Sequence, residues 1–299
     1  MKTSELLGFN PTDRLLLINA DDFGMCQATN AGIASLLRSG LPVSTSVMMT
    51  CPWALDASRL GRQLAHSDVG VHLTLTSEWE TYKWGPLNDI CRSASLRGED
   101  GFFPSDCPTF EAQADPEEVK AEINAQITKA LAWGIAPTHL DNHMGSLFGL
   151  ATGRNFVQIL IEAAAKHGLP LRLPRSAAAA FTDPALAELA ESSVQFADHH
   201  GVLIPDDLLN WPYAPETASY AEAKTRLFAA LEQMSAGISE LIMHPSAVND
   251  ELKAITPHWR WRGIEMGLLT DPQTWDKIKA EGIRVIRWSD LQAVQRRLA

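Results

Sequence analysis

Carboxylates and imidazoles that follow short apolar segments carry the chemistry that this sequence suggests. Asp21 and Asp22 stand side by side after the apolar run 15–18 and before Gly24. Neighbouring side chains that leave the end of a strand point in different directions, so one carboxylate can hold a metal ion while the other faces a substrate. Two adjacent acids repel each other, and a bound cation is one way to keep both ionised. The alternative is that Asp22 only caps the helix that follows.

Histidines stand in comparable places after later apolar segments. His72 lies in Gly-Val-His-Leu-Thr-Leu, and His244 lies in Leu-Ile-Met-His-Pro-Ser. The segment Thr-His-Leu-Asp-Asn-His contains His139, Asp141 and His143, whose spacing puts all three side chains on one face of a strand. A single histidine in an apolar strand is more often a hydrogen-bonded core residue than a ligand. The repeated placement in separate segments, rather than any one histidine, therefore indicates a site.

Short apolar runs alternate with helical patterns along the whole chain. Strands are expected at 15–18, 43–49, 69–74, 240–244 and 283–288, with further short segments at 138–142 and 171–173. Helices are expected at 29–38, from 116 to a stop at Gly134, at 155–166, 221–234 and 275–280, and after a cap at Ser289. This alternation predicts an α/β fold with a parallel sheet, either a barrel or an open doubly wound sheet. In both, the carboxyl ends of the strands converge on one face, where the residues above would meet.

The helix expected from residue 116 has the clearest amphipathic pattern. Val119, Ile123, Ile127 and Leu131 recur on one stripe, which we expect to face the core. No internal repeat, low-complexity segment or linker divides the chain.

The composition is that of a globular protein with a sizeable core. The chain has 299 residues, of which 45% are hydrophobic and 20% charged, enough for one large domain or two smaller ones. Its net charge of −11 argues against nucleic acid or an anionic membrane as a partner. The four cysteines form no C-x-x-C pair, so a zinc ribbon or redox motif is not expected. Residues 1–10 lack a signal-peptide pattern and no apolar run could span a bilayer, so we expect a soluble cytoplasmic protein with reduced thiols and no membrane insertion.

Four motifs, in order, resemble those of the YdjC-like carbohydrate deacetylases of the polysaccharide deacetylase-like superfamily. They are Asn-Ala-Asp-Asp-Phe-Gly at 19–24, Gly-Val-His-Leu-Thr at 70–74, Pro-Thr-His-Leu-Asp-Asn-His at 137–143 and Glu-Leu-Ile-Met-His-Pro at 240–245. Arg262, Glu265 and the segment 282–288 also look like the ending of that family. The resemblance covers nearly the whole chain. It implies one domain over residues 1–299 and a distorted, TIM-like (β/α) barrel of the polysaccharide deacetylase type.

The resemblance also implies an activity, the metal-dependent removal of N-acetyl groups from amino sugars. It makes Asp22, His72 and His143 the ligands of one divalent ion, Zn²⁺ or Mg²⁺ before Mn²⁺, Co²⁺ or Ni²⁺, with Asp21 as general base and His244 as general acid. Two neutral imidazoles and one carboxylate leave positions open on such an ion for water and a substrate carbonyl. The ion would polarise the acetamide and stabilise the oxyanion, while the leaving amine needs a proton from a nearby acid.

Three further residues are candidates for substrate binding or for support of the ligands. Arg175, in Leu-Pro-Arg, resembles an arginine near the family's site, although a surface salt bridge is an equal alternative. Asp141 and His139 share the segment of His143. Family members commonly continue this motif with more histidines, as His-x-Asp-Ser-His-His-His-Val-His, whereas this chain continues with Met144-Gly-Ser-Leu. The pocket wall beside the metal must therefore differ.

Aromatic residues suggest an N-acetylated sugar or oligosaccharide as the substrate, because flat rings stack on the apolar faces of pyranoses. The alternative for each ring is the core or a dimer contact; a homodimer is compatible with the family. The rings in loop-like stretches are Trp79, Tyr82, Trp84, Trp211, Trp259 and Trp261.

Two other function classes remain open. A sugar-binding or metal-dependent sensor could keep the fold without turnover, but it would not need both Asp21 and His244. A barrel isomerase or aldolase would use similar ligands, but such enzymes usually need a lysine or a second carboxylate pair near the metal, and these motifs contain neither. An iron oxygenase shares the ligand types, but its jelly-roll fold does not match the alternation of strands and helices along this chain.

Overall fold

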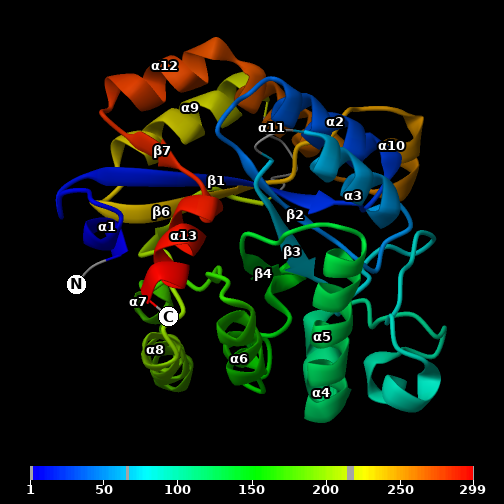
Figure 1. The fold of residues 1–299 in the computed structure, drawn as a ribbon. Helices are drawn as coiled ribbons and strands as arrows, with labels where there is room; N and C mark the ends of the chain where they lie inside the picture. Colours follow the sequence, from blue (N-terminus) through cyan, green and yellow to red (C-terminus); the bar gives the residue numbers. More distant parts are fainter. Residues whose placement is uncertain (1–2, 65–66, 214–218, 299) are drawn as a thin grey trace.

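A curled parallel sheet forms the centre of the protein (Figure 1). The computed structural model describes residues 3–64, 67–213 and 219–298. Its strands pair in the order β4-β3-β2-β1-β6-β5, with β7 also on β1, and every pair is parallel. The strands are β1 (Arg14–Phe23), β2 (Ser44–Val47), β3 (Val69–Leu73), β4 (Leu140–Asn142), β5 (Asp207–Leu208), β6 (Gly237–Met243) and β7 (Arg284–Ile286).

Strand β1 organises the sheet because three strands pair with it. β6 runs along one edge from residue 14 to residue 20, while the other edge pairs first with β7, at 15–17, and then with β2, at 19–23. A strand paired on both edges and covered on both faces is built from a continuous buried run, as residues 15–18 are. The strand predicted there extends to Phe23 and so includes both aspartates.

Irregular segments close the sheet between β4 and β6. Leu171 forms a parallel bridge with Leu140, and its amide donates to the carbonyl of Leu203 at 3.0 Å. The amide of Asp206 then donates to the carbonyl of Ile238 in β6 at 2.8 Å. The result is a distorted (β/α) barrel, which confirms the predicted fold class and decides between the two arrangements that the strand pattern allowed.

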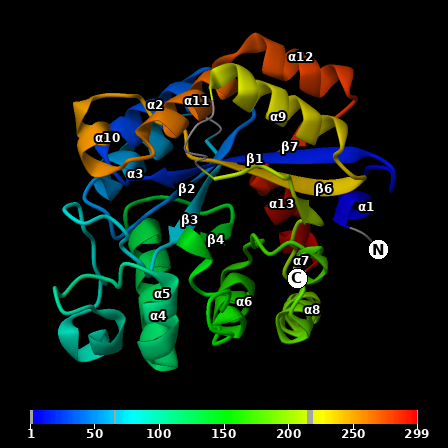
Figure 2. The same cartoon turned by 180° about the vertical axis from the view of Figure 1, so that it is seen from behind.

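The helices surround the barrel, with α2, α3, α10 and α11 together on one side and α5, α6 and α8 in a row on another (Figures 1 and 2). The longer ones are α2 (Gln27–Arg38), α3 (Ala54–Gln63), α5 (Pro116–Ala132), α6 (Val157–His167), α8 (Pro184–His199), α9 (Tyr220–Glu232), α11 (Trp259–Thr270), α12 (Pro272–Ala280) and α13 (Trp288–Leu298). The shorter ones are α1 (Thr3–Leu6), α4 (Cys107–Gln113), α7 (Ala177–Ala180) and α10 (Asp250–Ile255). In the described part of the chain, no helix is both long and apolar enough to cross a membrane.

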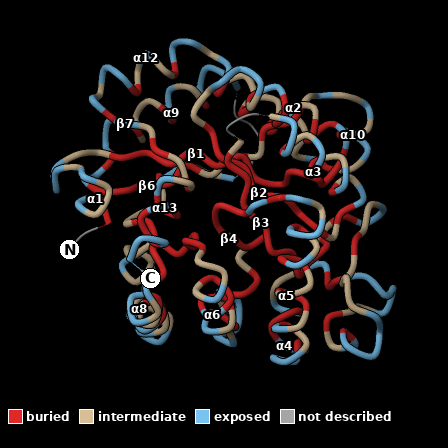
Figure 3. The backbone as a smooth tube through the Cα atoms, viewed as in Figure 1, coloured by how far each residue is buried: buried red, intermediate tan, exposed pale blue. Residues whose placement is uncertain are grey.

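The barrel interior changes from apolar to polar along β1. Leu16, Ile18 and Ala20 belong to the main core beneath the helices. Leu15 and Leu17 point the other way, into the barrel, where helix α13 covers the amino-terminal end and contributes two side chains to a small cluster. Besides Leu15 and Leu17, this cluster contains Ile238, Ile286 and the two α13 side chains, Trp288 and Leu291. Figure 3 shows the buried strands inside a shell of partly exposed helices.

Several predicted elements need correction. Helices α3, α4, α8, α10 and α11 were not expected, and α11 contains Trp259 and Trp261, which were assigned to a loop. Leu131 is 48% exposed, so the buried stripe of α5 does not include it. Helix α13 begins at Trp288, so Ser289 is not its cap; the backbone and hydroxyl of Ser289 instead donate to Asp68.

Candidate active site

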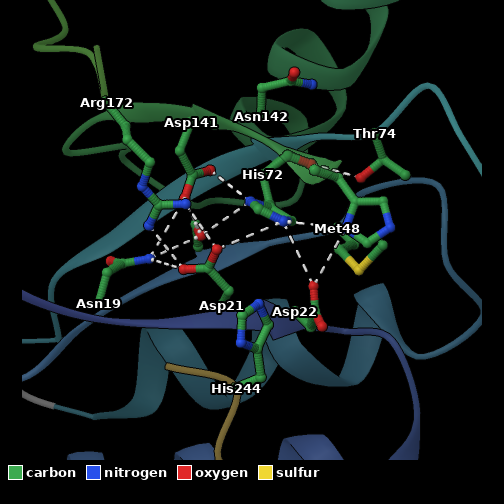
Figure 4. Close-up of polar contacts among 12 residues, drawn as sticks. Asn19, Asp21, Asp22, Met48, His72, Thr74, Asp141, Asn142, Arg172 and His244 are labelled. Carbon is green, nitrogen blue, oxygen red and sulfur yellow. Dashed lines mark hydrogen bonds and ion pairs between the residues drawn. The ribbon is translucent and has the colours of Figure 1, made fainter. Parts of the chain in front are cut away.

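The two aspartates at the end of β1 face different partners because the backbone turns between them (Figure 4). Asp22 has a φ of 70°, a left-handed conformation that residues other than glycine seldom adopt and that is frequent at functional sites. Gly24 follows with a φ of 93°, where a Cβ would lie 3.0 Å from the backbone of Ala54. The sequence led us to expect diverging carboxylates, and this local turn, with a register shift between Ala20 and Phe23, produces the divergence.

Asp22, His72 and His143 bring three ligand atoms together. Oδ1 of Asp22 lies 3.5 Å from Nε2 of His72 and 3.5 Å from Nδ1 of His143, and the two ring nitrogens are 3.3 Å apart. All three side chains are buried, and their ligand atoms lie within 4.8 Å of one another. Oδ1 of Asp22 has no hydrogen-bond partner among the described residues. An unpartnered buried carboxylate oxygen beside two ring nitrogens has the chemistry of a cation site.

A second carboxylate holds the outer nitrogen of each histidine. Nδ1 of His72 lies 2.8 Å from Oδ1 of Asp141, and Nε2 of His143 lies 2.9 Å from Oε2 of Glu78. An ionised carboxylate only accepts hydrogen bonds, so each outer nitrogen carries the proton and each inner nitrogen of a neutral ring offers its lone pair to the centre. This carboxylate–histidine pairing is usual behind metal ligands, so the residues fit a divalent ion.

The surrounding charges favour the same ion. Burial alone would raise the pKa of Asp22, but Arg262, whose Nη2 donates to Oδ2 of Asp22 at 2.6 Å, acts together with His143 and His244 to lower that pKa well below its usual value. Burial would lower the pKa of His143, but the attraction of Glu78 and Asp22 outweighs it and raises the pKa to about 10. For His72, the carboxylates led by Asp141 likewise raise the pKa against burial. The pocket thus attracts positive charge, whether protons or a cation.

Asp21 belongs to a polar layer directly beneath this cluster. We use "polar layer" for Asn19, Asp21, Ser46, Asp141, Arg172 and Glu240, all buried inside the barrel. Arg172 donates to both oxygens of Asp21, at 2.7 and 2.8 Å, and also contacts Asp141 and Glu240. A fork-shaped guanidinium fixes both the charge and the plane of a carboxylate. Oδ2 of Asp21 lies 3.8 Å from Nε2 of His72, so the fixed carboxylate borders the cation site.

His244 follows β6 and lies on another side of the two aspartates (Figure 4). Burial lowers the pKa of His244 to about 4 despite the attraction of Asp22 and Asp21. Its backbone amide donates to Oε2 of Glu265 at 2.7 Å, while its ring Nδ1 is 4.0 Å from the same oxygen. Burial raises the pKa of Glu265 to about 7. The ring of Tyr213 packs edge-on against His244, with centroids 4.8 Å apart.

Two candidates of the sequence analysis lie elsewhere. The ring of His139 stacks on Trp288 at 4.7 Å, at the closed end of the barrel, and does not line the cavity at the site. Arg175 pairs with Asp198 in a part-exposed salt bridge, the alternative considered for it, and the arginines that contact the two aspartates are Arg172 and Arg262. Arg172 had a signal in the sequence: a charged residue in the apolar triplet 171–173 must find buried counter-ions.

Glu78, a partner of His143, was also missed. It lies in a loop after β3 whose sequence gives no sign of a partner far along the chain.

Some aromatic candidates of the sequence analysis line the cavity, and others are buried beside the site. Trp79 lines the cavity, as does Tyr213, which was not a candidate. Trp84 is buried against His143, with its Nε1 bonded to the carbonyl of Thr76.

The site opens into a cavity of about 770 Å³. Asp21, Asp22, His72, His143 and His244 all line it, so the predicted ligands and both predicted proton-transfer residues share one cavity. This volume is in the upper part of the range of roughly 300–1,000 Å³ that is usual for small-molecule sites.

The family profile and the related sequences agree on one protein family. The sequence profile described as "YdjC-like protein" matches residues 15–280. The carbohydrate deacetylase of Thermoanaerobacter pseudethanolicus is 26% identical over 279 residues, covering 93% of this chain and 100% of that protein. The chitooligosaccharide deacetylase of Yersinia enterocolitica is 27% identical over 289 residues, covering 93% and 99%.

A solved structure agrees with these relatives. The crystal structure of a protein of Enterococcus faecalis V583, provisionally named for cellobiose-phosphate cleavage, is 27% identical and covers 93% of this chain and 99% of its own, with a TM-score of 0.76. Because the family profile spans most of the chain and carries the site residues with it, this protein belongs to the YdjC-like protein family.

Proposed function

We propose that this protein is a metal-dependent hydrolase that removes the N-acetyl group of an amino sugar. The observation that carries the proposal is the convergence of Asp22, His72 and His143 beside a second carboxylate, Asp21, that Arg172 holds in place. The named activities of the relatives from Thermoanaerobacter and Yersinia support the same reaction class. Amide hydrolysis needs a polarised carbonyl, an activated water and a proton for the leaving amine, and the cavity has a candidate for each.

Asp22, His72 and His143 would hold the divalent ion. When bound, such an ion polarises the acetamide carbonyl and makes a coordinated water more acidic. The outer bonds to Asp141 and Glu78 orient both rings before the ion arrives, since each fixes which nitrogen carries the proton. Oxygen and nitrogen ligands of this kind suit Zn²⁺ or Mg²⁺ and do not exclude Mn²⁺, Co²⁺ or Ni²⁺.

Asp21 would act as the general base. Its carboxylate lines the cavity; Oδ1 accepts from both Arg172 and Asn19, whereas Oδ2 accepts only from Arg172 and keeps a lone pair for a proton. The guanidinium prevents rotation of the carboxylate, so the free lone pair stays aimed at the space in front of His72. A proton taken from the attacking water would remain inside the polar layer, away from bulk solvent.

His244 would act as the general acid, but only when substrate is bound. With its pKa lowered to about 4 by burial, the free protein holds this ring neutral at pH 7. A bound sugar displaces water between the ring and the two aspartates, which strengthens their attraction for an imidazolium. We therefore expect His244 to take up a proton in the complex and to pass it to the amine nitrogen as the C–N bond breaks.

The direct test is acetate release from N-acetylglucosamine and from chito-oligosaccharides, before and after treatment with a chelator. We expect release that stops on chelation and returns when Zn²⁺, Mg²⁺, Mn²⁺, Co²⁺ or Ni²⁺ is added back singly. The Asp22→Ala variant should bind much less metal and release no acetate. Release that is unaffected by complete metal removal would contradict the proposed role of the ion. Absence of release from every N-acetylated sugar, with metal bound, would contradict the deacetylase activity itself.

A further inference from the structure

The cavity has two chemically different ends. One end holds the aspartates and histidines described above. Beyond them the lining is almost entirely apolar, with side chains from the loop after β4, from the segment between α7 and α8 and from helix α8. We call six of these lining residues the apolar wall: Phe148, Leu150, Phe181, Leu186, Leu189 and Ala190.

Helix α8 gives the apolar wall a regular structure. Leu186, Leu189, Ala190 and Ser193 line the cavity at spacings of three and four residues, which is one stripe of a helix. The hydroxyl of Ser193 donates to the carbonyl of Leu189 at 2.7 Å, so its proton is already used within the helix. This stripe therefore offers the cavity methyl and methylene groups and no free hydrogen-bond donor.

The loop after His143 extends the apolar lining toward the mouth of the cavity. Met144 has a φ of 55° and is 47% exposed, and Leu150 is 50% exposed; both line the cavity. Tyr213 is 52% exposed on the lining as well. Large apolar side chains that gather around an opening mark a binding surface more often than single exposed residues do.

We propose that the substrate of this site is a lipid-linked amino sugar: the N-acetylated ring lies at the aspartates and histidines, and a long apolar group, glycosidically attached, lies along the apolar wall. This inference rests on the proposed deacetylase function and names its substrate class. It is carried by the continuity of the two ends within one cavity, since a single molecule that fills it must be polar at one end and apolar at the other.

The alternative substrate, a longer oligosaccharide, does not suit the apolar wall. Additional sugar rings would bring several hydroxyl groups to a lining where α8 offers only the Ser193 oxygen, as an acceptor, and a buried hydroxyl without a partner is unfavourable. An alkyl chain has no such requirement. Each methylene that leaves water contributes about 0.8 kcal/mol, close to a fourfold factor in affinity.

The test uses the full-length enzyme loaded with the metal that gives most activity and a series of β-glycosides of N-acetylglucosamine. Methyl, butyl and octyl glycosides, each below its critical micelle concentration, carry the same acetamide and differ only in apolar length. We expect kcat/KM for acetate release to rise at least about tenfold from methyl to octyl, the effect of as few as two buried methylenes. We also expect octyl glucoside, which has no acetamide, to compete with the octyl substrate.

Substitutions in α8 locate the effect. Leu189→Gln puts an amide into the apolar wall and should reduce the octyl-to-methyl ratio of kcat/KM severalfold. Leu186→Gln makes the same change one helical turn earlier, and this variant is used if Leu189→Gln does not fold. Leu55→Gln is the matched control, since Leu55 is an exposed leucine of α3 that does not line the cavity, and it should leave the ratio unchanged.

Two results would overturn the inference while leaving the deacetylase function intact. One is metal-dependent acetate release that is equally fast on methyl and octyl glycosides or faster on N,N′-diacetylchitobiose. The other is a preference for the octyl glycoside that the folded α8 variants keep in full. Failure of all N-acetylated substrates would instead remove the proposed function, on which this inference rests.

Discussion

Glu78 holds the outer nitrogen of His143 at 2.9 Å, and the two residues are 65 positions apart in the chain. His143 in turn directs its inner nitrogen toward Oδ1 of Asp22. This contact gives the loop after β3 a part in the cation site, which a search for ligands alone would not find. Removing it should change metal binding although Glu78 is not itself one of the three proposed ligands.

We expect Glu78→Ala to lower metal affinity by about 10- to 100-fold, because the ring of His143 then loses the partner that fixes its orientation and proton position. Titration of the metal-free protein in competition with a chromogenic chelator measures this. Glu80→Ala is the matched control, since Glu80 lies two residues further along the same loop and is exposed. Equal affinities for the two variants would show that Glu78 does not support the site.

Asp21→Asn should keep bound metal and lose most turnover. The amide preserves the size of the side chain but cannot take a proton, and removal of a general base typically costs about 10²- to 10⁴-fold in rate. Metal content by elemental analysis and kcat for acetate release on the same sample separate the two effects. A variant that keeps a wild-type rate would require another base.

His244→Ala should slow hydrolysis of an acetamide more than that of an activated acetate ester. An amine leaves only after it is protonated, whereas a nitrophenolate leaves without a proton, so loss of the acid affects the first reaction selectively. The ratio of the two kcat/KM values, wild type against variant, is the measurement. Equal losses on both substrates would mean that His244 positions the substrate and does not supply the proton.

The two arginines near residue 174 should differ strongly in their effect on stability. Arg172 is buried against Asp21, Asp141 and Glu240, so Arg172→Met removes the cationic partner of three buried carboxylates and should cost about 3–5 kcal/mol in the free energy of unfolding. Arg175→Met, which only breaks the part-exposed pair with Asp198, should cost about 1 kcal/mol or less. Urea unfolding followed by circular dichroism compares them; similar losses would contradict the buried role of Arg172.

Stability should fall between pH 6.5 and pH 4 in part because of His139. Burial lowers the pKa of this ring from about 6.5 to about 4, so below pH 6.5 the unfolded chain takes up a proton that the folded protein does not. His139 therefore costs almost no stability at neutral pH and above, and its cost grows as the pH drops through 6.5, to about 2.5 kcal/mol by pH 4.5.

His139→Phe, which keeps a flat ring for the stack on Trp288, should lose less stability over this pH range than the wild type. Urea unfolding at pH 7 and at pH 4.5 gives the difference, and the exposed His199→Gln variant is the control. If the two pH dependences are the same for wild type and His139→Phe, the ring is not held neutral by burial.

The sequence alone determined the strands and the chemistry at their ends. Continuous apolar runs such as 15–18 make buried parallel strands, and parallel strands end on the same side of a sheet. For that reason Asp21, Asp22, His72, His143 and His244, each placed at or after such a run, could be expected to meet, and they line one cavity. The motifs also pointed to the family that the comparison established.

Tertiary structure decided which residues support that chemistry. Arg172 pairs with Asp21 across 151 positions and Arg262 with Asp22 across 240, and neither pairing leaves a local trace in spacing or periodicity. The left-handed turn at Asp22 and the apolar wall from α8 likewise arise from packing between distant segments. Local sequence fixes which face of a strand or helix a side chain occupies, but its partner depends on the curvature and closure of the whole barrel.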